Sequence, residues 1–287
     1  MTHRTLGAWL AIAAVAAAPL SLGAWGGQGH RLVGLLAAKH LSAVARENVE
    51  WLIGPATLAD VSGWADQQVT DTQQTARWHY LNIPPDAAGY DRDRDCPGQP
   101  GVAAGSRADT WRDCAVDRIT YFERRMADTA LDRADRATAL KFLVHFIGDL
   151  HQPFHALGVG RGGNDVHVRV FGQADCGDDP SRPRPCNLHS VWDSGLIARR
   201  SLSDQQYLAV LEALGAERRW EQQPPGTPAD WAVESWARAK DALVGQDTDI
   251  DEAYYAAQTP VIDERLARAG VRLAAVLNRA LSSPPPR

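Results

Sequence analysis

Residues Phe142–His155 read FLVHFIGDLHQPFH, and this stretch combines a helix pattern with metal-binding chemistry. Its apolar residues recur at the spacing of one helix face. His145 and Asp149 are four residues apart, so a helix places both side chains on one side, within reach of one metal ion. Pro153 lacks a backbone N–H and should end or kink the helix. The stretch therefore predicts a helix over 135–151 that presents metal ligands.

Apolar residues recur at this helical spacing along most of the chain, which predicts an all-α, mainly helical fold. No repeat, long linker or low-complexity tract divides the sequence, so we expect a single domain. Residues 165–171 (DVHVRVF) alternate valine with polar residues, which predicts a strand within a small β-hairpin, and Gly162-Gly163-Asn164 signals a turn before it. Further helices are expected over 30–40, 56–69 (with Asp60 as N-cap), 110–128, 187–199, 203–220, 229–243 and 260–281.

Residues 1–24 have the features of a cleavable secretory signal peptide: a basic start, the apolar run Leu6–Leu20 and small residues at the end. The run is shorter than the ~18 to 20 apolar residues that span a bilayer, although an N-terminal anchor is the alternative. We therefore predict a secreted or periplasmic protein with no membrane span after cleavage. The predicted domain covers 25–282, and the Pro-rich residues 283–287 are predicted to be a disordered tail.

Four cysteines lie in the part predicted to be exported: Cys96, Cys114, Cys176 and Cys186. An even number of cysteines in an oxidising compartment predicts two disulfides. Three pairings are possible, and we favour the sequence neighbours, Cys96–Cys114 and Cys176–Cys186. A cysteine zinc site is the alternative, but no CxxC spacing supports it.

A second pair, His189 and Asp193, repeats the spacing of four residues, and further histidines are found at His30 and His155. Zinc prefers histidine nitrogens and carboxylate oxygens in a tetrahedral arrangement. The pattern predicts a multinuclear zinc site. If the chain is cut before Trp25, a free α-amine joins the possible ligands.

The formal net charge is −5, which taken alone argues against a nucleic-acid partner. Bound zinc ions would concentrate positive charge in one cleft, and such ions can be the largest local charges in a site. The composition therefore does not exclude a phosphate-rich substrate.

Several motifs occur together in one order and at fitting distances. They are Trp25-Gly26-x-x-Gly29-His30, Trp64-Ala65-Asp66, Trp78–Pro84 (WHYLNIP), Phe142–His155, Gly162-Gly163-Asn164 and Asn187–Asp193 (NLHSVWD). Together they resemble the zinc-dependent single-strand nucleases of the S1/P1 family, across essentially the whole exported chain. That family shares a helical fold and a trinuclear zinc cleft with the bacterial zinc phospholipases C.

The resemblance implies three Zn²⁺ per chain, with Asp149 as a bridge between two of them. The first zinc would be held by Asp66, His79, His145 and Asp149. The second would be held by His155, His189 and Asp193. The third would take the α-amine and carbonyl oxygen of Trp25, together with His30 and Asp149. Asp66 and Asp149 are the candidate catalytic carboxylates.

The resemblance also implies substrate contacts beside the metals. Tyr80 occupies the position of an aromatic residue that stacks on a base. Asn82 lies where some members carry an aspartate that bonds the base, which leaves the base preference open. Asn164 is a candidate phosphate contact, although a turn-forming role is an equal alternative. His151 is expected to support a ligand rather than to be one.

The resemblance therefore implies an endonuclease acting on single-stranded DNA and RNA, with 5′-phosphate products and 3′-nucleotidase activity on 3′-mononucleotides. We expect a monomer without a stable protein partner. The alternatives are a phospholipase C-like zinc phosphodiesterase and a zinc-binding protein without turnover. Asp193 favours the nuclease, because we expect glutamate at that position in the phospholipases.

Overall fold

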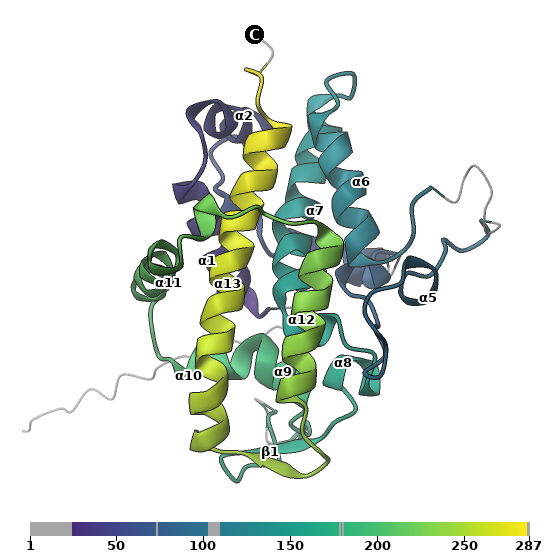
Figure 1. Ribbon diagram of the computed structural model, residues 1–287, viewed down its shortest axis with the longest axis vertical. Helices are drawn as coiled ribbons and strands as arrows, with labels where there is room; N and C mark the ends of the chain where they lie inside the picture. The colour runs from purple at the N-terminus through teal and green to yellow at the C-terminus, as the bar shows by residue number, and fades with distance from the viewer. Residues whose placement is uncertain (1–24, 73, 103–109, 178, 180, 286–287) are drawn as a thin grey trace, which may run out of the picture.

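The computed structural model describes residues 25–72, 74–102, 110–177, 179 and 181–285, and the predicted signal peptide lies outside them (Figure 1). The described chain is mainly helical, which confirms the predicted all-α class. The longer helices are α1 (Gly27–Lys39), α2 (Ala43–Ile53), α4 (Trp64–Thr72), α6 (Ala115–Ala127), α7 (Arg133–His151), α11 (Asp204–Arg218), α12 (Pro228–Ala242) and α13 (Glu252–Ala280).

Short helical turns connect these helices and supply much of the site described below. They are α3 (Leu58–Val61), η1 (Ala76–His79), α5 (Arg92–Asp95), η2 (Pro153–His155), α8 (Gly160–Gly163), α9 (Leu188–Ser190), η3 (Val191–Gly195), α10 (Leu196–Arg199) and η4 (Trp220–Gln222). The sequence pattern did not predict α2, which begins at the Ser42 N-cap.

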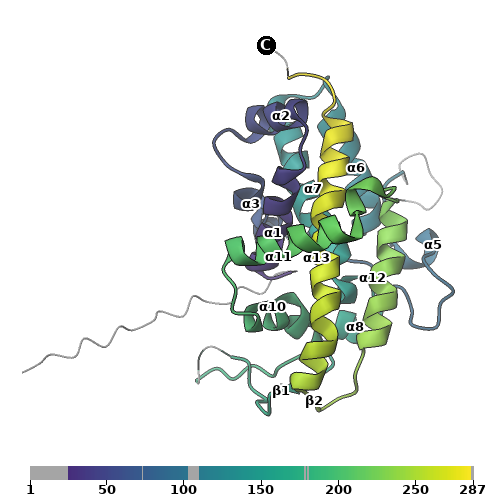
Figure 2. The same cartoon turned by 60° about the vertical axis from the view of Figure 1, so that its left-hand side comes forward.

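Helix α7 lies at the centre of the fold, and every residue from Phe142 to His151 is buried. A helix that is buried on all sides needs neighbours all round it. Helices α1, α2, α4, α6, α12 and α13 pack against it. In Figure 2, α13 runs along the molecule while α11 crosses in front of it. The polar residues in this part of α7, His145, Asp149 and His151, are therefore enclosed by protein.

Local chemistry sets both ends of α7. The Asp132 carboxylate accepts a hydrogen bond from the Asp135 backbone N–H, which satisfies one free donor of the first turn. The helix ends at His151, and Pro153 begins the separate turn η2, as its missing N–H predicts. The change of direction at Gln152 carries the chain from the helix to His155.

Two predicted helices are each divided in the structure. The segment 56–69 forms α3 and α4, and Thr57 rather than Asp60 is the N-cap. The predicted N-cap was wrong because Asp60 is the third residue of a capping box: Thr57 Oγ1 accepts from the Asp60 N–H, and Asp60 accepts from the Thr57 N–H. The segment 187–199 forms α9, the π-helical turn η3 and α10, since a wider turn interrupts it.

Helix α13 begins at Glu252 with Asp251 as N-cap, eight residues before the predicted start at Pro260. Proline removes one N–H from a helix, but here the first turn has its own support: the Asp251 side chain accepts from the Tyr254 N–H, and the Tyr254 hydroxyl donates to the Ala242 carbonyl oxygen. Beside the proline, Thr259 Oγ1 donates to the Tyr255 carbonyl oxygen at 2.8 Å. Pro260 therefore lies inside α13 and does not mark its start.

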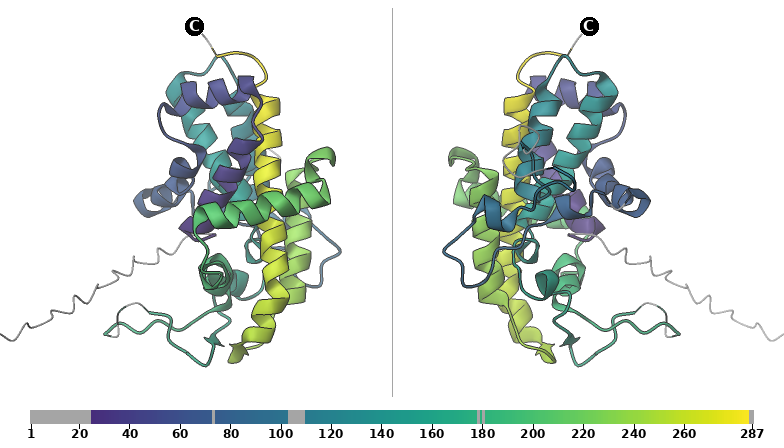
Figure 3. Two further views of the ribbon diagram at one scale, coloured as in Figure 1. Left: turned by 90° about the vertical axis from the view of Figure 1, so that its left-hand side faces the viewer. Right: turned by 90° about the vertical axis from the view of Figure 1, so that its right-hand side faces the viewer.

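The predicted β-hairpin is present only as isolated antiparallel bridges between residues 167–175 and 173–187, and the regular ladder of its strand has another partner. Strand β1 (Val168–Val170) pairs in parallel with β2 (Thr248–Ile250), which lies between α12 and α13. After Val170 the chain turns at Phe171 and Gly172, both with positive φ, and returns through isolated antiparallel bridges to Gln173 and Asn187. The regular ladder of β1 is made on its other edge, with the distant strand β2. Figure 3 shows the segment between β1 and α9 projecting from the lower end of the helical body.

Both favoured cysteine pairings are present in the structure. Cys96–Cys114 joins the loop after α5 to the start of α6, and Cys176–Cys186 closes the projecting segment between β1 and α9. At the C-terminus, the Ser283 carbonyl oxygen accepts from Asn48 Nδ2 at 2.8 Å, so the first residue of the predicted disordered tail is anchored. Among the described helices, none is long and apolar enough to cross a membrane.

Candidate metal centre

The structure brings the predicted ligands from separate elements to one buried region around α7. Trp25 precedes α1, and the eight other residues are His30 in α1, Asp66 in α4, His79 in η1, His145 and Asp149 in α7, His155 in η2, His189 in α9 and Asp193 in η3. Their side chains form groups whose nitrogen and oxygen atoms lie close enough to hold metal ions.

The first group surrounds the carboxylate of Asp149. His79 Nδ1 lies 3.0 Å and His145 Nε2 lies 3.2 Å from Asp149 Oδ2. Asp66 Oδ1 lies 3.3 Å from His145 Nε2 and 3.7 Å from His79 Nδ1. Two carboxylates and two imidazoles therefore face one point, as a tetrahedral zinc shell requires.

The second group consists of two stacked histidines and a carboxylate. The rings of His155 and His189 lie 5.0 Å apart and are nearly parallel. His189 Nε2 is 3.2 Å from Asp193 Oδ2, and His155 Nε2 is 3.6 Å from Asp193 Oδ1. Asp149 connects this group with the first, since its Oδ1 lies 3.6 Å from His155 Nδ1.

The third group contains His30, whose Nε2 lies 3.3 Å from Asp149 Oδ1. The His30 ring stacks on His145 and fits against Gly148, where a Cβ would lie 2.8 Å from His30 Nδ1. Trp25 is fully buried nearby, but its backbone nitrogen follows Ala24 in a peptide bond in this chain. The Asp149 carboxylate thus faces the first and third groups and lies beside the second through His155 Nδ1.

Backbone carbonyls fix the tautomers of three of these histidines. The Nδ1 of His145 lies 2.6 Å from the Ser62 oxygen, that of His155 lies 3.2 Å from the His79 oxygen, and that of His189 lies 2.7 Å from the Gly162 oxygen. A carbonyl oxygen cannot donate, so each Nδ1 carries the proton. Each Nε2 then faces a carboxylate oxygen. This pairing needs positive charge, which is supplied either by a second proton on the ring or by a cation held between the nitrogen and the oxygen.

Several buried atoms in these groups have no hydrogen-bond partner. They are His30 Nδ1 and Nε2, His79 Nε2, Asp149 Oδ1 and His155 Nε2. A buried polar atom without a partner costs about 1–3 kcal/mol. Metal cations would satisfy the atoms that face one another, so the donor set fits a metal centre of histidine and carboxylate ligands.

The pKa values of these groups show the same need for positive charge. Burial alone would raise the pKa of Asp149, but the charge of His145 and hydrogen bonds from the neighbouring histidines hold it well below its usual range. Burial likewise opposes the shift at Asp193, whose pKa is held low by His189 and His155. Both carboxylates therefore remain ionised in the interior and available as ligands.

The glycine loop of α8 supports the second group. Arg161 and Gly162 have left-handed backbone angles, with φ of 51° and 64°. A Cβ on Gly162 would lie 2.5 Å from the Phe154 carbonyl oxygen. This close approach places the Gly162 oxygen against His189 Nδ1, next to the residue that precedes His155. Glycine is required here both for its backbone angles and for space.

The predicted substrate residues lie around the exposed side of the centre. Tyr80 follows His79 and is 38% exposed, and Asn82 is also exposed. Asn164 Nδ2 donates to the Arg161 carbonyl oxygen at 2.9 Å, so its amide holds the glycine loop. Asp66 is the most exposed of the candidate ligand side chains, at 34%, which marks the opening of the site.

His151 faces away from the metal groups, toward α12 and α13. Its Nδ1 lies 2.7 Å from the Ile147 oxygen, and Arg272 donates to its Nε2 at 2.9 Å. Burial lowers the pKa of His151 well below its usual value, and Arg265 and Arg272 lower it further, so the ring is neutral. His151 is therefore part of a buried polar network behind the C-terminal end of α7.

Gln152, to which no sequence pattern assigns a role, lies against a candidate ligand. Gln152 Nε2 donates to Asp193 Oδ1 at 2.6 Å, and both residues are buried. The two residues are 41 positions apart, and only the fold brings them together. No local sequence pattern reveals such a pair.

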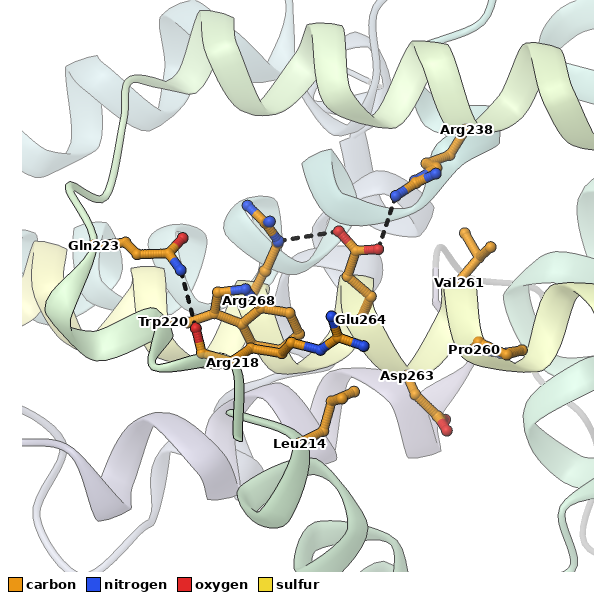
Figure 4. A pocket seen from close by; sticks show the side chains of 10 residues that line it. All are labelled: Leu214, Arg218, Trp220, Gln223, Arg238, Pro260, Val261, Asp263, Glu264 and Arg268. Carbon is orange, nitrogen blue, oxygen red and sulfur yellow. Dashed lines mark hydrogen bonds and ion pairs between the residues drawn. The ribbon is translucent and has the colours of Figure 1, made fainter. Parts of the chain in front are cut away.

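A separate cavity of about 720 Å³ lies between α11, α12 and α13 (Figure 4). Its acidic side chain Glu264 is paired with Arg238 at 2.9 Å and Arg268 at 3.1 Å. Asp263 is paired with Arg200 at 2.7 Å. No histidine is among the described residues that line this cavity, and its charges largely neutralise one another. The cavity therefore does not share the metal-binding chemistry of the groups around α7.

Comparison with known proteins gives the family. The S1/P1 nuclease family model matches residues 25–282. Endonuclease 2 of Arabidopsis thaliana is 29% identical over 275 residues, which cover 89% of this chain and 90% of that protein. Nuclease P1 of Penicillium citrinum is 29% identical, covering 88% of this chain and 97% of that protein. Nuclease S1 of Aspergillus oryzae is 26% identical, covering 96% and 98%. With its family model matched over nearly nine tenths of its length, the chain belongs to the S1/P1 nuclease family.

Proposed function

We propose that this protein is an exported zinc-dependent endonuclease of single-stranded DNA and RNA. Its products would carry 5′-phosphates, and it would also hydrolyse 3′-mononucleotides. Family membership supports the broader statement that the chain is a nuclease acting on nucleic acids. The finer proposal rests on the chemistry of the candidate metal centre.

One observation carries the proposal: the two oxygens of a single buried carboxylate, Asp149, face ligand candidates of two different groups, His30 and His145. Zinc ions held there would supply activation of water near neutral pH and charge neutralisation on the phosphate. Ligation through neutral histidines and ionised carboxylates suits zinc better than magnesium, which prefers oxygen ligands and keeps several waters.

The protein's own groups would bind and orient the substrate. Tyr80 is exposed beside His79 and presents an aromatic ring on which a base can stack. Stacking tolerates every base but requires an unpaired strand, since duplex bases are stacked on each other. Asp66 and His189 are the more exposed ligand candidates, with side chains 34% and 18% accessible, so the phosphate would approach from their side.

The test begins with the purified exported protein. Bound zinc is measured by elemental analysis, and single-stranded DNA, RNA, 3′-AMP and phosphatidylcholine are assayed with and without chelator. We expect about three zinc ions per chain and hydrolysis of the first three substrates that chelation abolishes. Hydrolysis of lipid without cleavage of nucleic acid would favour a phospholipase C-like enzyme. Full zinc without turnover on any substrate would favour a zinc-binding protein.

A matched pair of variants tests the ligand assignment. Asp66→Asn should lower zinc content and nuclease activity together, because an amide is a much weaker zinc ligand than a carboxylate. Asp204→Asn is the control, since the Asp204 side chain is similarly exposed at 31% but pairs with Arg31. Equal zinc content in the two variants would contradict the role of Asp66.

The proposed role of the Trp25 α-amine has its own test. Protein that retains one extra residue before Trp25 should hold less zinc than protein that begins at Trp25, because an amide nitrogen does not replace an amine ligand. Unchanged zinc content and activity in the extended protein would exclude the amine as a ligand.

A further inference from the structure

Gln152 is a fully buried polar residue at the junction between α7 and η2. Burying an amide is unfavourable unless its donor and acceptor both find partners. Both ends of the Gln152 amide form a hydrogen bond. One bond reaches the candidate ligand Asp193, and the other reaches Phe154, the residue before His155.

The oxygen end fixes the orientation of the amide. The backbone N–H of Phe154 donates to Gln152 Oε1 at 2.5 Å. A backbone N–H can only donate, so the oxygen must face Phe154, and the NH₂ group must face the other way. This arrangement directs the donor toward the carboxylate of Asp193, 2.6 Å from its Oδ1.

The contact leaves the two oxygens of Asp193 in different situations. Oδ1 accepts the Gln152 N–H and lies 3.6 Å from His155 Nε2, whereas Oδ2 faces His189 Nε2 at 3.2 Å and accepts no hydrogen bond from Gln152. The backbone oxygen of Asp193 is also held, since it accepts from the Gly26 N–H at 2.6 Å. The side-chain and backbone contacts together restrict how the carboxylate can rotate within the π-helical turn η3.

We propose that Gln152 is a positioning residue that orients Asp193 so that Oδ2 is presented to a zinc ion shared with His155 and His189. This inference rests on the proposed function. Groups that hydrogen-bond to a metal-binding carboxylate reduce its freedom, and losing one typically weakens metal affinity or activity by roughly 10- to 100-fold.

Two variants separate this role from a purely structural one. Gln152→Glu has nearly the same shape and can still accept the Phe154 N–H, but it places a second acceptor against Asp193 Oδ1. Gln152→Met keeps the volume and loses both hydrogen bonds. If Gln152 only shapes the turn after α7, the first variant should behave like wild type while the second loses stability.

Ser235→Ala serves as a matched control within the same region. Ser235 is also fully buried, and its Oγ donates to the Leu150 carbonyl oxygen at 2.5 Å. It touches the C-terminal end of α7 and Arg265 but none of the candidate ligands. Its removal should reduce thermal stability without changing zinc retention.

The experiment measures the rate at which a colorimetric chelator removes zinc from each zinc-loaded protein, together with zinc content, kcat and KM on a single-stranded oligonucleotide. We expect both Gln152 variants to release one zinc ion roughly 10- to 100-fold faster than wild type. Their kcat should fall more than KM changes, and added zinc should restore activity. The Ser235→Ala variant should release zinc at the wild-type rate.

Zinc release from Gln152→Glu at the wild-type rate would overturn the inference while leaving the proposed function intact. The same holds if Ser235→Ala accelerates release as much as either Gln152 variant, because the effect would then follow from general loosening of the helix end. A wild-type protein that binds no zinc would remove the proposed function and this inference together.

Discussion

Replacing Gly162 with alanine should destabilise the protein and disturb the second ligand group. Two effects combine at this position. The backbone is left-handed, with φ of 64°, and a Cβ would lie 2.5 Å from the Phe154 carbonyl oxygen. Neither effect can be relieved easily, because the Gly162 oxygen accepts from His189 and Phe154 directly precedes His155.

The magnitude follows from the two effects taken separately. A non-glycine residue in the left-handed region costs about 1–2 kcal/mol. Forcing a methyl group into a filled site costs about 1–3 kcal/mol more. The whole substitution should therefore cost about 2–5 kcal/mol. For a chain of this size, each kcal/mol lowers the midpoint of thermal unfolding by roughly 2–4 °C.

Gly172→Ala provides the matched control. Gly172 also has positive φ, at 81°, but nothing lies within 4 Å of an added Cβ. It should show only the backbone cost of about 1–2 kcal/mol. Thermal unfolding of the two zinc-loaded variants, with zinc content measured on the same samples, isolates the close contact between Gly162 and Phe154.

We expect Gly162→Ala to unfold at the lower temperature and to lose zinc, whereas Gly172→Ala should keep its zinc. Equal unfolding temperatures and full zinc in both variants would refute the reasoning. That result would mean that the α8 loop can move away from Phe154 without displacing His155 or His189.

Three further predictions follow from other contacts. Glu234→Gln should cost about 3 kcal/mol in urea unfolding, because it leaves the buried Arg265 without its carboxylate partner at 2.7 Å. Burial alone would raise the pKa of Glu234, but neighbouring arginines lower it to about 2 from 4.5, so its stabilising contribution is complete above pH 4.5 and lost toward pH 2. The difference between wild type and this variant should therefore shrink over that pH range, and a constant difference would contradict the pairing. Replacing Cys96 and Cys114 together with serine should remove about 3 kcal/mol and lower the unfolding temperature, and an unchanged temperature would show that the bond contributes little. Tyr80→Ala should raise KM for single-stranded DNA by roughly 5- to 150-fold, from a stacking loss of about 1–3 kcal/mol per base, and an unchanged KM would exclude stacking at this position.

Sequence patterns predicted well wherever a few neighbouring residues set the structure. The period of α7 and the break at Pro153 are local properties, and the structure confirms both. The favoured cysteine pairings also join near neighbours and are present. In each case the relevant residues are close along the chain, so few alternative arrangements compete.

The predictions failed where distant segments compete with local ones. The strand at 165–171 is expected to pair within a hairpin, yet only isolated bridges join it to the returning chain, and its regular partner is β2, near residue 250. The helix ending at Ala280 is expected to begin at Pro260, but the Asp251 N-cap and the hydrogen bonds of Tyr254 to Trp192 and Ala242 extend it back to Glu252. Periodicity describes one segment at a time and carries no information on which other segment covers it.

Residue order and spacing were enough to predict the helical class and, from His145 and Asp149, that two potential ligands share a helix face. They also placed the family motifs in order along the chain. The folded chain was needed to show that Asp149 faces both His30 and His145, that backbone carbonyls of Ser62 and Gly162 orient the histidines, and that Gln152 holds Asp193. This difference arises because helix geometry fixes neighbours four residues apart, whereas the environment of a buried carboxylate depends on packing among segments far apart in the chain.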